Sequence, residues 1–229
     1  MPEPCAYLFD MDGLLLDTER LFFEAGLPLL QDIGMQATEA ESFFLSMVGS
    51  SGAESRARLA EIAGPRAAML EVEWRKAHKE RIARDGIPLR PTVQETVLQL
   101  AGQGVRMAVV TSSHRVNALH HLEIAGLAHH FELVVAGDEV PANKPDPAPY
   151  LQAATALGVD PRACAAFEDS DPGIASATRA GCIAFQIPDM RPKNVPLPML
   201  GQRTATNLAE AVAALHADLR ADRLQLRST

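Results

Sequence analysis

Short runs of apolar residues alternate along the chain with longer stretches of helical spacing. The apolar runs cover residues 6–9, 105–111, 133–137, 163–167 and 182–187. None of them alternates strictly with polar residues, which is typical of strands buried on both faces of a parallel sheet. We therefore predict that these runs form the strands of one parallel sheet.

The stretches between the later runs predict helices. Residues 93–104, 116–126 and 147–158 each combine helical spacing with a final glycine, a common helix terminator. The repeated order of strand, helix and strand predicts an α/β domain with right-handed crossovers.

One long segment breaks this order, because residues 18–86 contain no strand-like run. Apolar stripes opposite charged faces recur there over residues 21–34, 54–64 and 67–86. The predicted fold class is therefore α/β, with a Rossmann-like parallel-sheet core and an inserted all-α helical cap domain. We place the core at residues 1–17 and 89–229 and the cap at residues 18–88.

The length and net charge of the chain limit the size of its core and the kinds of partner that it can bind. The chain has 229 residues, 47% of them hydrophobic, and a formal net charge of −8. This length is enough for one hydrophobic core of ordinary size, or for a core with an attached lobe. Because a net-negative chain binds polyanions poorly, we expect neither nucleic acid nor an acidic membrane as a partner.

Cysteine content and the N-terminus indicate the compartment. The three cysteines, Cys5, Cys164 and Cys182, include no CxxC pair and do not suggest a disulfide framework or a zinc site. Cys164 and Cys182 fall in apolar runs and are expected to be small core residues. The N-terminus does not have the pattern of a signal peptide, and no apolar run is long enough to span a membrane. We expect a soluble, cytoplasmic protein.

Four short motifs follow predicted strands, where open α/β sheets bind their ligands. They are FDMDG with Asp10 and Asp12, VVTSS with Thr111, NKPDP with Lys144, and FEDSDPG with Glu168 and Asp169.

The acidic motifs suggest a cation site. Two carboxylates as close as Asp10 and Asp12 repel each other unless a cation relieves the repulsion. Glu168 and Asp169 add further oxygen ligands, and few oxygen ligands with a polyanionic substrate are typical of Mg²⁺. Taken alone, each acidic motif is equally consistent with a turn or a capped loop.

The other two motifs suggest an anion site. The Thr111 hydroxyl and the backbone N–H groups of Ser112 and Ser113 suit a phosphoryl oxygen. Lys144 comes before Pro145 and Pro147, which restrict the local backbone, and it could neutralise charge on both a phosphate and a carboxylate. The alternatives are a simple helix N-cap for Thr111 and a solvated surface position for Lys144.

The order DMDGLLLDTE, TSS, KPDP and FEDSDPG resembles the haloacid dehalogenase superfamily, in its phosphatase and β-phosphoglucomutase-like branch with a helical cap. The resemblance covers about residues 4–18 and 90–190. It implies that Asp10 attacks phosphorus and that Asp12 protonates the leaving oxygen and then activates water. It also implies that Asp10, the Asp12 carbonyl and Asp169 hold Mg²⁺, with Glu168 beside or behind it. Thr111, Ser112 and Lys144 would bind the transferring phosphoryl group.

One departure from the family pattern and two further candidate residues bear on the reaction and on the choice of substrate. Phe22 lies where the mutase subgroup has a histidine, which favours a phosphatase. Arg115 is a candidate for gripping a substrate phosphate or carboxylate, with a solvated helix residue as the alternative. In similar proteins the loop that contains Ser50 faces the active site, so Ser50 is a further candidate for substrate contact. The cap is expected to close over the site.

The leading hypothesis is a Mg²⁺-dependent phosphatase that acts on a small phosphorylated metabolite, as a monomer or weak homodimer. A sugar-phosphate mutase would use the same aspartyl-phosphate. A 2-haloacid dehalogenase needs neither Asp12 nor the Glu168–Asp169 pair, and a signalling receiver lacks the DxDG spacing and the helical insertion. A catalytically silent binding protein would have no need for the full set of expected catalytic side chains.

Overall fold

The computed structural model describes residues 4–48, 52–192 and 194–226, and the side chains of residues 222–226 are not described. The described chain forms two compact units. Unit 1 contains residues 1–16, 89–189 and 198–229, and unit 2 contains residues 17–88 and 190–197. We describe each unit by itself.

Unit 1 is built on a six-stranded parallel sheet with the strand order β3-β2-β1-β4-β5-β6. The strands are β1 (Ala6–Phe9), β2 (Met107–Val110), β3 (Leu133–Val135), β4 (Cys164–Glu168), β5 (Ile183–Gln186) and β6 (Arg203–Thr204). The five predicted apolar runs coincide with β1 to β5. The exposed edge strand β6 was not predicted, because two polar residues make no apolar run.

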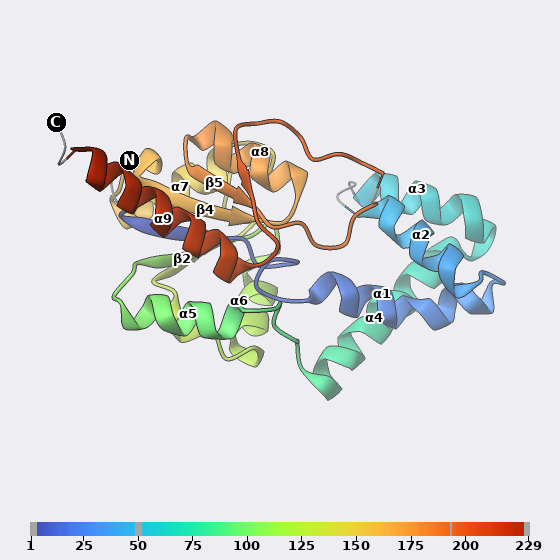
Figure 1. Ribbon diagram of the computed structural model, residues 1–229. Helices are drawn as coiled ribbons and strands as arrows, with labels where there is room; N and C mark the ends of the chain where they lie inside the picture. The colour runs from blue at the N-terminus through green and yellow to red at the C-terminus, as the bar shows by residue number, and fades with distance from the viewer. Residues whose placement is uncertain (1–3, 49–51, 193, 227–229) are drawn as a thin grey trace. The chain divides into compact units, whose positions relative to one another are not determined.

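Helices connect and cover these strands. They are α5 (Val93–Gly102), α6 (Arg115–Ile124), α7 (Ala148–Leu157), α8 (Asp171–Ala180) and α9 (Leu208–Leu226). Figure 1 shows α7 and α8 on one side of the sheet and α5 on the other. The predicted α/β fold with a parallel sheet is confirmed.

The two faces of the sheet bury different side chains. Small and branched residues of the central strands, such as Leu8, Val110 and Ala166, pack with Tyr150 and Ile174 of α7 and α8. The alternate positions of β1, β4 and β5 are aromatic, and the rings of Phe9, Phe167 and Phe185 stack in sequence. Cys164 and Cys182 are buried and free, as expected for core residues, and burial raises the pKa of the Cys182 thiol to about 12.

Unit 2 is helical. It contains α1 (Thr18–Asp32), α2 (Ala37–Met47), α3 (Gly52–Ala63) and α4 (Ala67–Asp85). These helices pack around Leu30, Phe44, Leu59, Leu70 and Trp74. Gly26 on α1 makes room for the Trp74 indole, because a Cβ atom there would lie 1.8 Å from its ring. In the sequence, this helical segment falls between β1 and β2.

The second part of unit 2 comes from a distant segment. Residues 190–197 group with the helices, and Met190 packs against their core. The predicted boundaries placed this segment with the sheet. It has prolines at positions 192 and 196 and no helical or strand spacing, so its sequence contains no pattern that would assign it to either unit.

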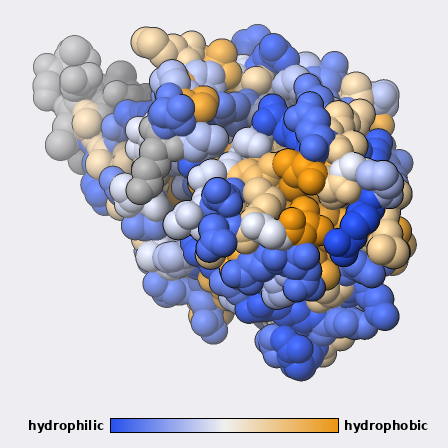
Figure 2. Space-filling view, turned by 90° about the vertical axis from the view of Figure 1, so that its right-hand side faces the viewer, coloured by the Kyte–Doolittle hydropathy of each residue, from blue (hydrophilic) through white to orange (hydrophobic). Residues whose placement is uncertain are grey.

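The surface of unit 2 includes apolar side chains. Figure 2 shows apolar residues gathered among hydrophilic ones on the face it presents. Among the described residues, the exposed large apolar side chains of this unit are Ile62, Met69, Val72 and Val195. Over the described residues, every helix is too short or too polar to cross a membrane.

Candidate active site

The predicted site residues of unit 1 lie at the carboxyl ends of neighbouring strands. Asp10 follows β1, Thr111 follows β2 and Glu168 ends β4. The register pairs Phe9 with both Val109 and Phe167, so Asp10, the first residue after β1, lies beside Glu168. The Asp10 amide donates to the Phe167 carbonyl at 3.0 Å, which continues the sheet pairing to this point.

Lys144 joins Asp10 and Glu168. Its side chain is only 5% exposed, and its ammonium group donates to Asp10 Oδ1 and lies 2.6 Å from Glu168 Oε1. A third contact, 2.8 Å to the Val110 carbonyl, fixes the ammonium at the end of β2. One buried cation therefore lies between two buried carboxylates.

The three carboxylates of Asp10, Glu168 and Asp169 form a compact group. One oxygen from each lies within 4.8 Å of the other two, a spacing that suits a shared metal ion. Gly13 makes this approach possible, because a Cβ atom there would lie 2.4 Å from Asp169 Oδ2. Its backbone also has φ +85°, a conformation that glycine adopts without strain.

Asp12 is held by hydroxyl groups that follow β2. Ser113 Oγ donates to Asp12 Oδ2 at 2.7 Å, and Thr111 Oγ1 lies 3.4 Å from the same oxygen. The Ser113 amide donates to Thr111 Oγ1 at 3.0 Å, which fixes the turn. The structure thus brings Asp12 and Thr111 together. The Ser113 hydroxyl is a contact that the sequence analysis did not single out, although it lies in the same TSS motif.

Glu168 is fully buried among residues of unit 1. Tyr150 of α7 donates its hydroxyl to Oε1 at 2.5 Å, and Ser170 Oγ lies 3.4 Å from Oε2. Gly173 of α8 gives this carboxylate its space, because a Cβ atom there would lie 1.9 Å from Oε2. Tyr150 was also missed by sequence reasoning. The one signal for it in the sequence is that a single tyrosine lies in an alanine-rich helical stretch. Such a tyrosine is a candidate for a polar contact, because a buried tyrosine hydroxyl usually has a polar partner.

Burial and charge set the proton affinities of this group. Burial raises the pKa of Asp10 well above its usual value, and Glu168 and Asp12 raise it further against the effect of Lys144. Burial alone would lower the pKa of Lys144, but Asp10 and Glu168 outweigh this and raise it, so the ammonium stays charged. Burial and Glu168 also raise the pKa of Tyr150, which keeps its hydroxyl a donor.

The other residues predicted to bind substrate are Arg115, Ser112 and Ser50. Arg115 donates through one nitrogen to Glu139 at 2.9 Å and to the Val134 carbonyl at 3.1 Å. These contacts hold the guanidinium beside β3, and a role of Arg115 in substrate binding stays a prediction. Ser112 lies beside Thr111, and its carbonyl closely approaches Gly137. Ser50 lies outside the described residues.

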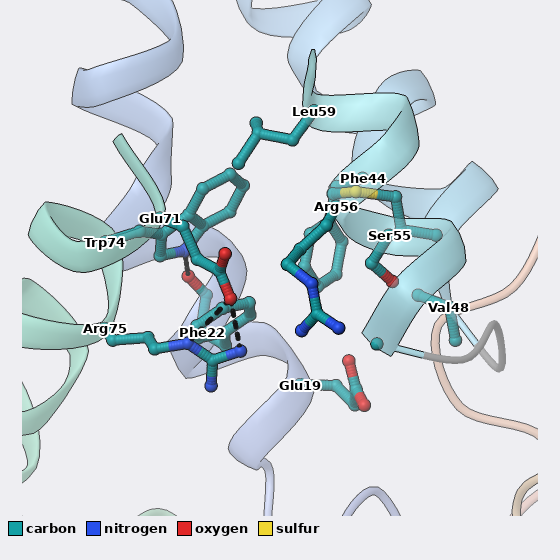
Figure 3. A pocket seen from close by; sticks show the side chains of 12 residues that line it. Glu19, Phe22, Phe44, Val48, Ser55, Arg56, Leu59, Glu71, Trp74 and Arg75 are labelled. Carbon is teal, nitrogen blue, oxygen red and sulfur yellow. Dashed lines mark hydrogen bonds and ion pairs between the residues drawn. The ribbon is translucent and has the colours of Figure 1, made fainter. Parts of the chain in front are cut away.

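Unit 2 has a pocket of its own, with a volume of about 260 Å³. Phe22, Phe44 and Trp74 supply aromatic walls, with the Phe22 and Trp74 rings stacked at 5.1 Å. Figure 3 shows Arg56 extending from α3 into this space, while Arg75 is bonded to Glu71. The lining of this pocket therefore combines aromatic side chains with charged ones.

Comparison with known proteins places the chain in a family. The model of haloacid dehalogenase-like hydrolases matches residues 7–187. This match covers most of the chain, which therefore belongs to this family. The resemblance stated from the motifs and the expected enzyme class, a hydrolase, are confirmed.

Individual relatives include phosphatases. The chain is 33% identical over 178 residues to a phosphorylated carbohydrates phosphatase of Thermotoga maritima, covering 77% of this chain and 81% of the relative. It is 28% identical over 229 residues to hexitol phosphatase B of Escherichia coli, covering 91% and 94%. Among solved structures, a putative β-phosphoglucomutase from Thermotoga maritima has a TM-score of 0.76 and 27% identity, covering 93% of this chain and 98% of that one.

Proposed function

We propose that this protein is a Mg²⁺-dependent phosphatase that hydrolyses a small organic phosphomonoester through an aspartyl-phosphate at Asp10. The observation that supports this most directly is the group formed by the buried Asp10 and Glu168 and the half-buried Asp169, with Lys144 bonded to two of its members. The family, and relatives named as phosphatases of phosphorylated carbohydrates and hexitols, favour a sugar or polyol phosphate as substrate.

The donor set fits Mg²⁺. Mg²⁺ prefers hard oxygen ligands such as carboxylates, and it commonly binds one or two carboxylates together with a substrate phosphate. We propose that Asp10, Asp169 and the Asp12 carbonyl hold it, with Glu168 beside it. When bound, Mg²⁺ would neutralise charge on the phosphoryl group and favour the ionised form of Asp10.

The chain's own residues would then perform two displacements. In the first, an Asp10 carboxylate oxygen bonds to phosphorus while the bond from phosphorus to the leaving oxygen breaks, and Asp12 gives that oxygen a proton. In the second, Asp12 accepts a proton from water as the water oxygen bonds to phosphorus and the Asp10–phosphorus bond breaks. Lys144 and Thr111 would stabilise charge on the transferring group.

Hydrolysis is favoured over a mutase reaction by Phe22. The position where the mutase subgroup has a histidine holds an aromatic ring with no titratable group. That ring stacks on Trp74 and meets His78 edge-on at 5.2 Å. We infer that unit 2 selects the organic part of the substrate and that Arg56 and Ser55 of its pocket are the candidates for this role.

A screen of phosphate release tests the proposed function. Purified protein would be assayed against sugar, polyol and nucleotide monophosphates, with Mg²⁺ and with excess EDTA, and without a sugar bisphosphate activator. We expect inorganic phosphate from at least one polyol or sugar phosphate, and a loss of at least about 100-fold in EDTA that added Mg²⁺ restores.

Two outcomes would contradict the proposal. Turnover that is equally fast in EDTA would remove the role of the metal. Conversion of a sugar phosphate to its isomer, only when a bisphosphate is present and without phosphate release, would assign the mutase reaction instead.

A further inference from the structure

The contacts of Tyr150 connect it to two members of the candidate site. Its side chain is fully buried in the third position of α7, behind β1, β2 and β4. Its hydroxyl donates to Glu168 Oε1 at 2.5 Å, and Lys144 Nζ lies 5.5 Å from the centre of its ring. One side chain therefore contacts the carboxylate through its hydroxyl and the ammonium through its ring face.

Glu168 Oε1 is shared between two donors. Lys144 Nζ lies 2.6 Å from the same oxygen that accepts from Tyr150. The other oxygen, Oε2, faces Ser170 and the close backbone of Gly173. The tyrosine hydroxyl thus fixes the rotation of the carboxylate and takes up part of the negative charge on Oε1.

This sharing affects Asp10, because Lys144 donates to Asp10 as well. If Oε1 lost the hydroxyl, its full charge would attract the ammonium toward Glu168 and weaken the contact with Asp10. The carboxylate would also lose the bond that sets its direction within the acidic group of Asp10, Glu168 and Asp169.

We propose that Tyr150 is a positioning residue, which orients the Glu168 carboxylate and through it the Lys144 ammonium beside Asp10. The part of this inference that concerns catalysis rests on the proposed phosphatase reaction. The part that concerns the acidic group does not, since it predicts a change in Mg²⁺ binding by itself.

Tyr150→Phe is the sharpest test, because it keeps the ring against Lys144 and removes only the hydroxyl. With p-nitrophenyl phosphate as probe, we expect kcat to fall by roughly 10-fold while KM stays within about 2-fold. By isothermal titration calorimetry, we expect the Kd for Mg²⁺ alone to rise by roughly 10-fold.

Tyr7→Phe is the matched control. Tyr7 is the chain's other tyrosine, is also buried, and its hydroxyl lies 3.0 Å from His216 Nε2. Because His216 lies outside the acidic group, this variant is expected to keep the wild-type kcat and Mg²⁺ affinity. Circular dichroism spectra and melting curves of both variants would establish that they fold.

A double variant separates positioning from a general structural role. In a Glu168→Ala background the side chain that Tyr150 orients is gone, so adding Tyr150→Phe is expected to change kcat by less than about 2-fold. A further 10-fold fall in that background would overturn the proposal, because Tyr150 would then act independently of Glu168.

The two measurements also distinguish this inference from the proposed function. If no phosphomonoester were hydrolysed by the wild type, the phosphatase proposal would fail, while weaker Mg²⁺ binding by Tyr150→Phe would still support the positioning role. An unchanged Mg²⁺ Kd in that variant would overturn the positioning role, whatever the wild type hydrolyses.

Discussion

Replacing Asp10 by asparagine is expected to lower phosphate release by on the order of 10³-fold or more. Asparagine has nearly the size of aspartate, but its amide is a far weaker nucleophile than a carboxylate. Asp10 is buried at the end of β1, where the sheet pairing continues through its amide. The loss would therefore be chemical, and the steady-state kcat with a saturating substrate and Mg²⁺ measures it.

Asp32→Asn is the matched control for this prediction. Asp32 is exposed at the end of α1 in unit 2, and the same change of side chain there is expected to leave kcat unaltered. Retention of more than about a tenth of the activity by Asp10→Asn would be incompatible with a nucleophilic role for Asp10.

Lys144→Met is expected to destabilise unit 1 by about 3–5 kcal/mol in EDTA. Methionine retains an apolar chain of similar length, but the buried carboxylates of Asp10 and Glu168 lose the cation between them. Uncompensated buried charge is among the largest single causes of instability in proteins. Mg²⁺ would partly replace the missing positive charge, so the difference from wild type is expected to shrink when the ion is added.

Urea unfolding followed by far-ultraviolet circular dichroism measures this effect, since the only tryptophan, Trp74, lies in unit 2 and would report on that unit. Lys76→Met is the control. Its side chain is 73% exposed and lies 3.8 Å from Glu80 on the surface of α4, so a change within about 0.5 kcal/mol is expected. Equal midpoints for Lys144→Met and wild type in EDTA would contradict the account of a buried pair of carboxylates.

The sheet could be predicted from the sequence because fully buried parallel strands leave continuous apolar runs. Each of the five predicted apolar runs coincides with one of the strands β1 to β5. The predictions did not extend to α8 and α9. Helix α8 has Pro172 and Gly173 in its first turn, and α9 is rich in alanine. Alanine is nearly indifferent to burial, so the apolar stripe of such a helix stands out poorly from its other faces.

The acidic part of the site was predictable because the carboxyl ends of neighbouring parallel strands meet at one edge. That rule brings Asp10 and Glu168 together without any knowledge of side-chain directions. The contacts of Tyr150 and Ser113 depend on the direction of individual side chains. Tyr150 contacts Glu168 only because α7 packs its third residue against β4, and spacing along the chain does not contain that information.

The most direct test of the central claim is to trap the phosphoryl group on the protein. Enzyme turning over its best substrate with Mg²⁺ would be quenched in acid and reduced with borohydride, which converts an acyl phosphate of aspartate to homoserine. Peptide mass spectrometry is expected to find homoserine at position 10 and unmodified aspartate at positions 12 and 169. Phosphate release without any reduction at Asp10, or with homoserine at another aspartate, would contradict the account.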